Sequence, residues 1–134
     1  MKDFVPYEQA LELDELGFDE PCLAHLIGFG DGTIENGRYK TNQQQVFYPD
    51  DYVTSDDKAE ELGLHPFVLC GVPTFSQAFR FFRERHGVYM HPSRFDETKW
   101  WVCWGSYTSH ICDSFEEAEL ACLRKLISLA QASQ

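Results

Sequence analysis

The sequence lacks any long apolar stretch, and it also lacks a secretion signal. No segment approaches the roughly 18 consecutive apolar residues that a membrane-spanning helix requires. The first ten residues, MKDFVPYEQA, contain neither an apolar core segment nor a small-residue cleavage site. We therefore expect a soluble cytoplasmic protein whose mature form is the whole chain.

Cysteines at redox or metal-binding spacing are missing as well. The five cysteines form no C-x-x-C motif and lie at Cys22, Cys70, Cys103, Cys112 and Cys122. An odd number at such wide spacing argues against a disulfide framework. We interpret these residues as small apolar side chains in a reducing cytosol.

Cationic residues are scarce in the first half of the chain. The sequence has 11 Lys and Arg against 22 Asp and Glu, which gives a formal net charge of −11. Residues 1–65 hold 15 acidic and 4 basic side chains, whereas residues 66–134 hold 7 of each. This negative field opposes binding to a phosphate backbone or to an anionic membrane, so both are disfavoured as partners.

Apolar residues are plentiful enough to build one core, because 43% of the 134 residues are hydrophobic and 15% are aromatic. We expect a single globular domain over residues 1–134, with a polar acidic excursion around residues 38–64. Apolar periodicity and capping signals such as TFSQ and SFEE predict helices over 5–18, 74–87 and 113–131. A weaker helical turn is predicted over 55–63.

The stretch TFSQAFRFFRERHG, residues 74–87, raises the question of whether its arginines grip an anion or only face water. Its aromatic residues fall on one helical face, at Phe75, Phe79, Phe82 and His86. The arginines occupy much of the rest of the helix. We expect the phenyl rings to pack inward and the arginines to face solvent or to pair with acidic residues.

Strands are predicted between the helices. CLAHLIGFG and GTIENG read as a hairpin over GDG, HPFVLCGV as a buried strand, and GVYMH as a strand directly after the second helix. KWWVCWGSYTSHIC reads as a hairpin that turns near Gly105 and Ser106, with apolar residues on both faces of its first strand. The predicted fold class is α+β, an antiparallel sheet with about three helices packed on it, in the order α-ββ-(loop)-β-α-βββ-α.

Three stretches resemble a known family: YEQALELDELGFDEPC, PTFSQAFRFFRERHG and SFEEAELACLRKLI. They are similar to small uncharacterised proteins of tailed phages, prophages and mobile elements in gut bacteria, especially Bacteroidetes. The resemblance implies a genomic setting without an assigned activity. The chain departs from the family pattern in the longer, more acidic segment 31–64 and in the Trp-rich strand WWVCW.

The spacing of cysteine and histidine residues does not match that of a structural zinc site. Cys22 and His25 form a single C-x-x-H, and His86 and His91 are separate from them. A structural zinc site normally combines two close ligand pairs. We therefore predict no metal site and no cofactor.

Nucleophilic catalysis would need an activated thiolate, for which Cys103 or Cys112 with His110 or His86 are the candidates. An activated thiolate also needs an electropositive, partly exposed site, and the neighbouring sequence supplies none. Adjacent acids on polar segments are usually only solvated. We predict no catalytic residue and favour a protein that is not an enzyme, while a small enzyme with a Cys/His site stays an alternative.

The leading hypothesis is an accessory protein of a phage or mobile element that binds a host or phage protein in the host cytosol. The contact surface that we predict lies within residues 31–64. Its candidate residues are Tyr48, Asp50, Asp51, Tyr52, Asp56, Asp57, Glu60 and Glu61. Self-association through a strand edge is left open. A second alternative is an acidic inhibitor that mimics a nucleic acid and blocks a restriction or CRISPR effector.

Overall fold

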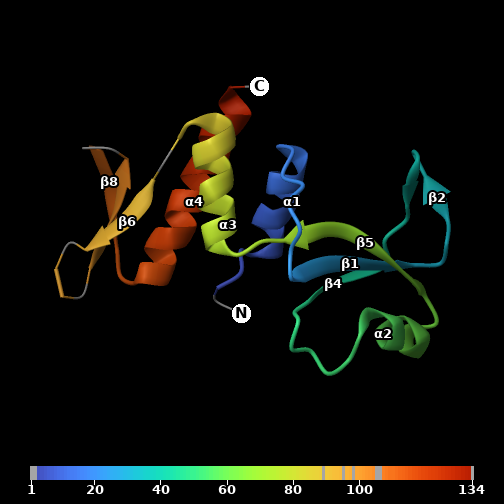
Figure 1. The fold of residues 1–134 in the computed structure, drawn as a ribbon. Helices are drawn as coiled ribbons and strands as arrows, with labels where there is room; N and C mark the ends of the chain where they lie inside the picture. The colour runs from blue at the N-terminus through green and yellow to red at the C-terminus, as the bar shows by residue number, and fades with distance from the viewer. Residues whose placement is uncertain (1–2, 89, 95, 98, 105–106, 134) are drawn as a thin grey trace. The chain divides into compact units, whose positions relative to one another are not determined.

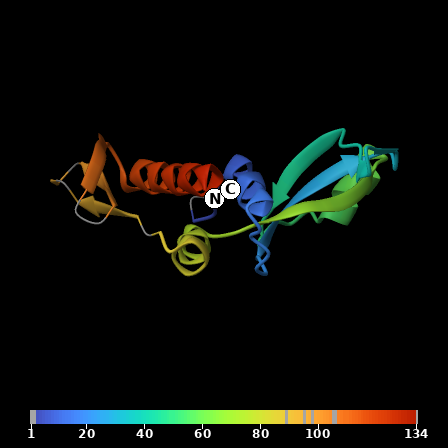
Figure 2. The same ribbon diagram turned by 90° about the horizontal axis from the view of Figure 1, so that it is seen from above.

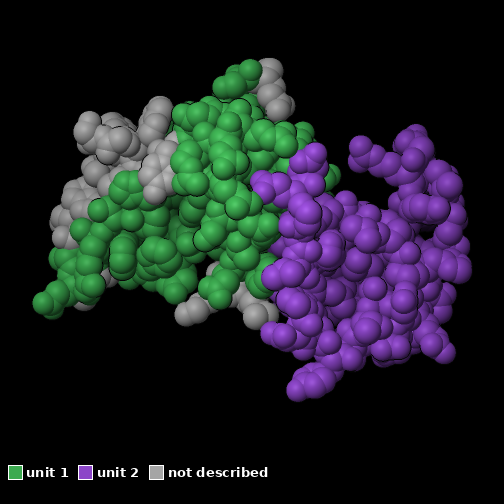
Figure 3. All heavy atoms as spheres, viewed as in Figure 1, with its two compact units in different colours: residues 1–18, 73–134 green, residues 19–72 purple. Residues whose placement is uncertain are grey.

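The computed structural model describes residues 3–88, 90–94, 96–97, 99–104 and 107–133, and within 101–110 it describes the backbone alone. The protein has an α+β fold with antiparallel sheets, as predicted. The chain forms two compact units, unit 1 from residues 1–18 and 73–134 and unit 2 from residues 19–72 (Figure 3). Unit 2 is thus inserted in unit 1 along the chain. The single domain over 1–134 stays a prediction.

Unit 2 is built on a three-stranded antiparallel sheet, and Figure 2 shows its strands side by side. The central strand β1 (Ala24–Gly30) pairs with β4 (Gln43–Phe47) and with β5 (His65–Val72). Helix α2 (Ser55–Leu62) supplies Ala59 to a core cluster with residues of β1, which confirms the weaker helical prediction. The members of this cluster and the partly buried residues against it are Ile27, Phe29, Ala59, Phe47, Leu62 and Leu64.

The predicted hairpin over GDG is wrong. The strand β2 (Ile34–Glu35) pairs with β3 (Arg38–Tyr39) instead of with β1. The chain reverses at Asn36 and Gly37, whose φ angles of 54° and 78° lie in the left-handed region. Asn-Gly is the preferred sequence for a two-residue hairpin turn, which explains why the reversal occurs there.

Two glycines on β1 allow close packing on one face of this sheet. A Cβ atom on Gly28 would lie 2.7 Å from the ring of Phe67 on β5. A Cβ atom on Gly30 would lie 2.1 Å from the backbone oxygen of Lys40, just after β3. The β2–β3 hairpin can therefore approach β1 only because position 30 has no side chain.

The described residues of unit 1 form four helical segments and a three-stranded antiparallel sheet (Figure 1). The helical segments are α1 (Tyr7–Glu15), α3 (Phe75–Phe81), the π-helical turn η1 (Phe82–His86) and α4 (Phe115–Ala132). The strands are β6 (His91–Arg94), β7 (Trp100–Trp104) and β8 (Tyr107–Cys112), with β7 in the centre. Helix α4 packs against all three strands and contacts α1 and α3.

Helix termini in unit 1 follow the sequence signals. The Thr74 hydroxyl accepts a hydrogen bond from the amide of Gln77, whose side chain accepts one from the Thr74 amide, so this capping box is confirmed. Ser114 caps α4 by accepting from the Glu117 amide. The Glu117 carboxylate accepts from the amide of Asp113 at 3.1 Å, one residue before the cap.

The arginine-bearing helix turns its aromatic side toward the core, as predicted. Phe75, Phe81 and Phe82 are buried, whereas Arg80, Arg83 and Arg85 are exposed. Phe79 and His86 are only half-buried. The predicted regular helix ends in a π-helical turn, which no local sequence pattern indicated.

Two strand predictions for unit 1 can be compared with the backbone. The Trp-rich strand β7 is central between β6 and β8, as its two apolar faces indicated. The strand predicted directly after the second helix is present as β6, but its predicted bounds of 87–91 are wrong, because Gly87 caps η1 with a φ of 65° and β6 begins at His91. Among the described residues, we find no helix with the length and apolar character needed to cross a membrane.

Candidate functional site

The predicted contact residues fall on one continuous part of unit 2, the loop after β4 and the helix α2. A tight turn starts this segment. The Tyr48 amide donates to the Asp51 carboxylate at 2.7 Å, and the Asp51 amide donates to the Tyr48 carbonyl at 3.1 Å. Asp51 therefore fixes the loop backbone through its own side chain.

A capping box then fixes the start of α2. The Asp57 amide donates to the Thr54 hydroxyl at 3.2 Å, and the Thr54 amide donates to the Asp57 carboxylate at 3.5 Å. The pattern T-x-x-D preceding the apolar positions of α2 could have revealed this box. Asp57, like Asp51, thus has a structural role that the contact-surface hypothesis did not assign.

The remaining acids and one aromatic ring point to solvent. Asp50 and Tyr52 are exposed in the loop, and Tyr52 is as accessible as in an extended chain, with a relative exposure of 102%. Val53 beside it is 50% exposed. Tyr48, the other candidate tyrosine, is half-buried. We call the exposed set the acidic surface, and it comprises Asp50, Tyr52, Val53, Asp56, Glu60 and Glu61.

The acids of α2 lie in two rows along its solvent side. Asp56 and Glu60 are four residues apart, as are Asp57 and Glu61, and all four are exposed. Ala59 faces the core on the opposite side of the helix. Unit 2 as a whole holds ten acidic and three basic side chains. This charge balance attracts cationic partners and repels anionic ones.

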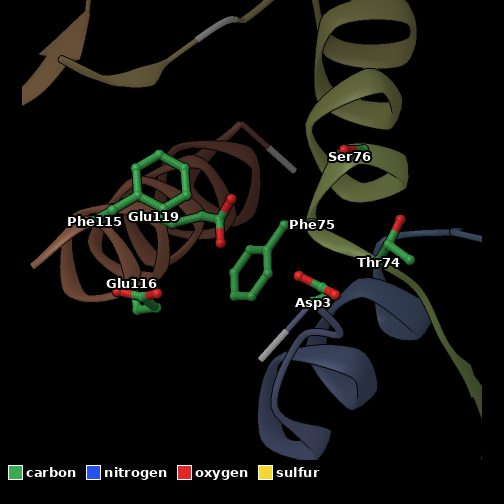
Figure 4. Close-up of a pocket in the computed structure, with 7 residues that line it drawn as sticks. All are labelled: Asp3, Thr74, Phe75, Ser76, Phe115, Glu116 and Glu119. Carbon is green, nitrogen blue, oxygen red and sulfur yellow. The ribbon is translucent and has the colours of Figure 1, made fainter. Parts of the chain in front are cut away.

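A cavity of about 350 Å³ in unit 1 gathers residues that sequence reasoning did not connect (Figure 4). It is lined by the N-terminal segment, the start of α3 and the first turns of α4. In Figure 4 the ring of Phe75 is seen between the carboxylates of Asp3 and Glu119. The full lining is Asp3, Thr74, Phe75, Ser76, Phe115, Glu116 and Glu119.

The electrostatics of this cavity disfavour negative charge. Burial raises the pKa of Glu119 above its ordinary value, and the carboxylates of Glu116 and Asp3 raise this pKa further. The described residues include no group of three or more His, Cys, Asp or Glu placed to hold a metal ion. The cavity is therefore an acidic hollow in which the charged form of Glu119 is disfavoured.

Where their side chains are described, the candidate zinc and thiol residues belong to no group of three or more potential metal ligands. The Cys22 thiol donates to the Glu20 carbonyl at 3.4 Å. Burial raises the pKa of Cys22, and the negative charge of Glu20 raises this pKa further. Burial, Glu117 and Asp113 raise the pKa of Cys112. A raised pKa keeps a thiol protonated and poorly nucleophilic at neutral pH. The side chains of Cys103 and His110 lie outside the described part.

A second aromatic hollow in unit 2 was also missed by sequence reasoning. A space of about 430 Å³ is lined by Tyr39, His65 and Phe67 together with Gly30, Gly32 and Pro66. The rings of Tyr39 and Phe67 lie 5.2 Å apart between centroids. The Asn-Gly turn was the available signal, because it brings the strand carrying Tyr39 back toward the sheet.

No family model, no curated protein sequence and no solved structure matches this chain. The resemblance to phage and mobile-element proteins therefore stays a prediction, and the geometry of the chain itself is the basis for a functional proposal.

Proposed function

We propose that this protein is a non-enzymatic accessory protein of a phage or mobile element that binds a host or phage protein in the cytosol through the acidic surface. The observation that carries the proposal is the full exposure of Tyr52 on a loop whose backbone is fixed at both ends. The turn at Tyr48 and Asp51 and the capping box of Thr54 and Asp57 provide this fixation. Because the backbone that carries Tyr52 is already ordered, binding loses less conformational entropy.

Tyrosine residues are enriched among the residues that contribute most to binding at protein interfaces. In sequence, Tyr52 is followed by the exposed Val53 and lies between the exposed acids Asp50 and Asp56. The partner that fits this chemistry has an apolar pocket for one aromatic ring with basic residues around its rim. Burial of the ring would supply affinity, while the surrounding charges would speed association.

The test replaces Tyr52 with the photo-crosslinker p-benzoylphenylalanine and exposes the protein to a lysate of a Bacteroidetes gut bacterium. We expect crosslinking to one predominant protein, which is then purified for affinity measurement. Tyr52→Ala should weaken binding by about 30-fold or more, as for a buried interface tyrosine. Tyr39→Ala, which removes an exposed tyrosine of the same unit, is the matched control and should change little. Equal binding of Tyr52→Ala and the unmodified protein would refute the proposal.

The nucleic-acid mimic is the second candidate, and the two rows of exposed acids on α2 favour it. In a mimic, regularly spaced carboxylates replace phosphates, so the charges and not the ring determine binding. A variant that neutralises the acidic surface should keep Asp51 and Asp57, because their carboxylates accept hydrogen bonds from backbone amides. The informative variant replaces only the four exposed acids with amides, at Asp50, Asp56, Glu60 and Glu61.

The two candidates give opposite results with the same pair of variants. A mimic loses binding in the four-amide variant and keeps it in Tyr52→Ala, and its binding weakens steeply with salt. A ring-anchored complex loses binding in Tyr52→Ala and is slowed mainly in its association rate by the four amides. A matched charge control neutralises exposed acids of unit 1, at Glu8, Asp14, Glu15 and Glu97.

A further inference from the structure

A groove in unit 1 lies between the π-helical turn η1 and the last turns of α4. Its volume is about 360 Å³, which is at the lower end of the roughly 300–1,000 Å³ of small-molecule sites. The buried side chains of Phe82 and Leu126 and the half-buried side chain of Leu129 form its apolar wall. Figure 1 shows α3 and α4, which also contact each other, side by side.

Two basic side chains stand at the edge of this groove. Arg85 is exposed, and its guanidinium carbon lies 5.8 Å from the centroid of the Phe81 ring. The His86 ring lies 5.3 Å from the Phe81 ring and 5.6 Å from the Phe82 ring, between centroids. The contact with Phe82 places the His86 ring next to the apolar wall, and Arg85 lines the same groove. π-helical turns occur frequently at functional sites, which adds a reason to consider this one.

The charge of the groove is opposite to that of the chain. Its lining includes Arg85 and His86 and no acidic residue among those that the structure describes. In a chain with a net charge of −11, this lining places positive charge beside apolar surface.

We propose that this groove binds a small monocarboxylate with an apolar body, such as a medium-chain fatty acid. The apolar body packs against Phe82, Leu126 and Leu129, and the carboxylate accepts hydrogen bonds from the Arg85 guanidinium and a ring N–H of His86. A guanidinium matches a carboxylate in a two-bond arrangement. A phosphate would bring a second negative charge against the field of the whole chain, and this favours the monoanion.

The proposal goes beyond the partner-binding function, because the groove belongs to unit 1 and the acidic surface to unit 2. Its probe is sodium octanoate, compared with the neutral analogue 1-octanol. Binding is followed in ¹⁵N-labelled full-length protein by amide shift changes during titration at neutral pH. We expect shifts to concentrate in residues 82–88 and 126–133, and octanoate to bind about tenfold more tightly than octanol.

The variant Arg85→Gln removes the charge at an exposed position. It should weaken octanoate binding about tenfold and leave octanol binding unchanged. Arg124→Gln, which removes an exposed charge from α4 outside the groove, should leave both unchanged. Ala130→Leu narrows the groove and should weaken both ligands. Equal affinity of octanoate and octanol, unchanged octanoate binding in Arg85→Gln, shifts outside these residues, or no shifts up to 10 mM octanoate would each overturn the proposal.

Discussion

At the scale of single residues, two glycines are required for different reasons. Gly30 has the Lys40 carbonyl where a Cβ atom would be, whereas a Cβ atom on Gly63 would have nothing within 4 Å. Gly63 needs its glycine only for its φ of 69°. A side chain at position 30 would therefore be opposed by a steric clash, whereas a side chain at position 63 would be opposed only by backbone strain.

Gly30→Ala should destabilise the protein by about 3 kcal/mol or more, because a backbone oxygen cannot move aside without breaking the hairpin contact. Gly63→Ala should cost about 1 kcal/mol, the penalty for a left-handed alanine. Urea unfolding followed by circular dichroism gives both values. Similar costs for the two variants would show that the hairpin does not pack on β1 as described.

The protonation of Glu119 in the acidic cavity makes the stability of the protein depend on pH. Burial and the neighbouring carboxylates raise its pKa in the folded state, so the folded protein holds this proton up to a higher pH than the unfolded chain does. Stability therefore falls as the pH rises from the unfolded pKa through the raised folded pKa, and the penalty persists at pH 7.

Glu119→Gln removes that penalty and should raise the melting temperature at pH 7 by roughly 1–2 °C. The difference should disappear near pH 3.5, where Glu119 is protonated in both states. Thermal melts at both pH values provide the measurement, and Glu8→Gln, on the exposed side of α1, serves as the charge control. A variant less stable than the parent at pH 7 would contradict the electrostatic account.

At the scale of elements, helix ends were the most predictable feature of the chain. TFSQ, SFEE and the glycine after ELDEL marked boundaries that the structure confirms at Thr74, Ser114 and Gly17. These signals act within four residues, so local sequence contains them completely. The partners of β1 were not predictable in this way, because β4 and β5 come from distant parts of the sequence and only tertiary packing selects them.

The candidate site shows the same division between local and long-range information. Exposed acids and Tyr52 could be predicted from polarity alone, whereas the burial of Tyr48 depends on its surroundings in the fold. The cavity near Glu119 joins three separate segments, and the groove at Arg85 joins two. Because these segments are distant in the sequence, no local pattern of residues predicts either the cavity or the groove.

The cap of α3 provides a prediction for this scale. Thr74→Ala removes the hydroxyl that accepts from the Gln77 amide and should lower the free energy of unfolding by about 1 kcal/mol, whereas Thr74→Ser should retain most of it. Tryptophan fluorescence during urea unfolding is a suitable measurement, because all three tryptophans belong to unit 1. Equal losses in both variants would mean that the threonine methyl group, not the cap, stabilises α3.

At the scale of the whole molecule, charge is unevenly shared between the two units. Unit 2 holds ten acidic side chains against three basic ones in 54 residues, from 19 to 72. Such an excess keeps a protein soluble but makes its compact state repel itself. Salt should relieve this repulsion, because the Debye length falls from about 30 Å at 0.01 M to about 3 Å at 1 M.

We expect the melting temperature to rise by roughly 2–5 °C between 0.01 M and 0.5 M sodium chloride. The four-amide variant at Asp50, Asp56, Glu60 and Glu61 should show a smaller rise, because part of the repulsion is already gone. Differential scanning calorimetry gives both slopes. The same slope in the two proteins would place the repulsion outside the acidic surface.

The N-terminal segment bonds to the residues that directly follow unit 2, since the Val5 amide donates to the Pro73 carbonyl at 3.0 Å and Phe4 pairs with Thr74. During translation, those partners leave the ribosome only after all 54 intervening residues have been made, which takes roughly 3–10 s. The segment that contains Val5 must wait that long for the partners to which its backbone bonds. A chaperone that shields emerging apolar segments would therefore have a long interval in which to bind the segment around α1.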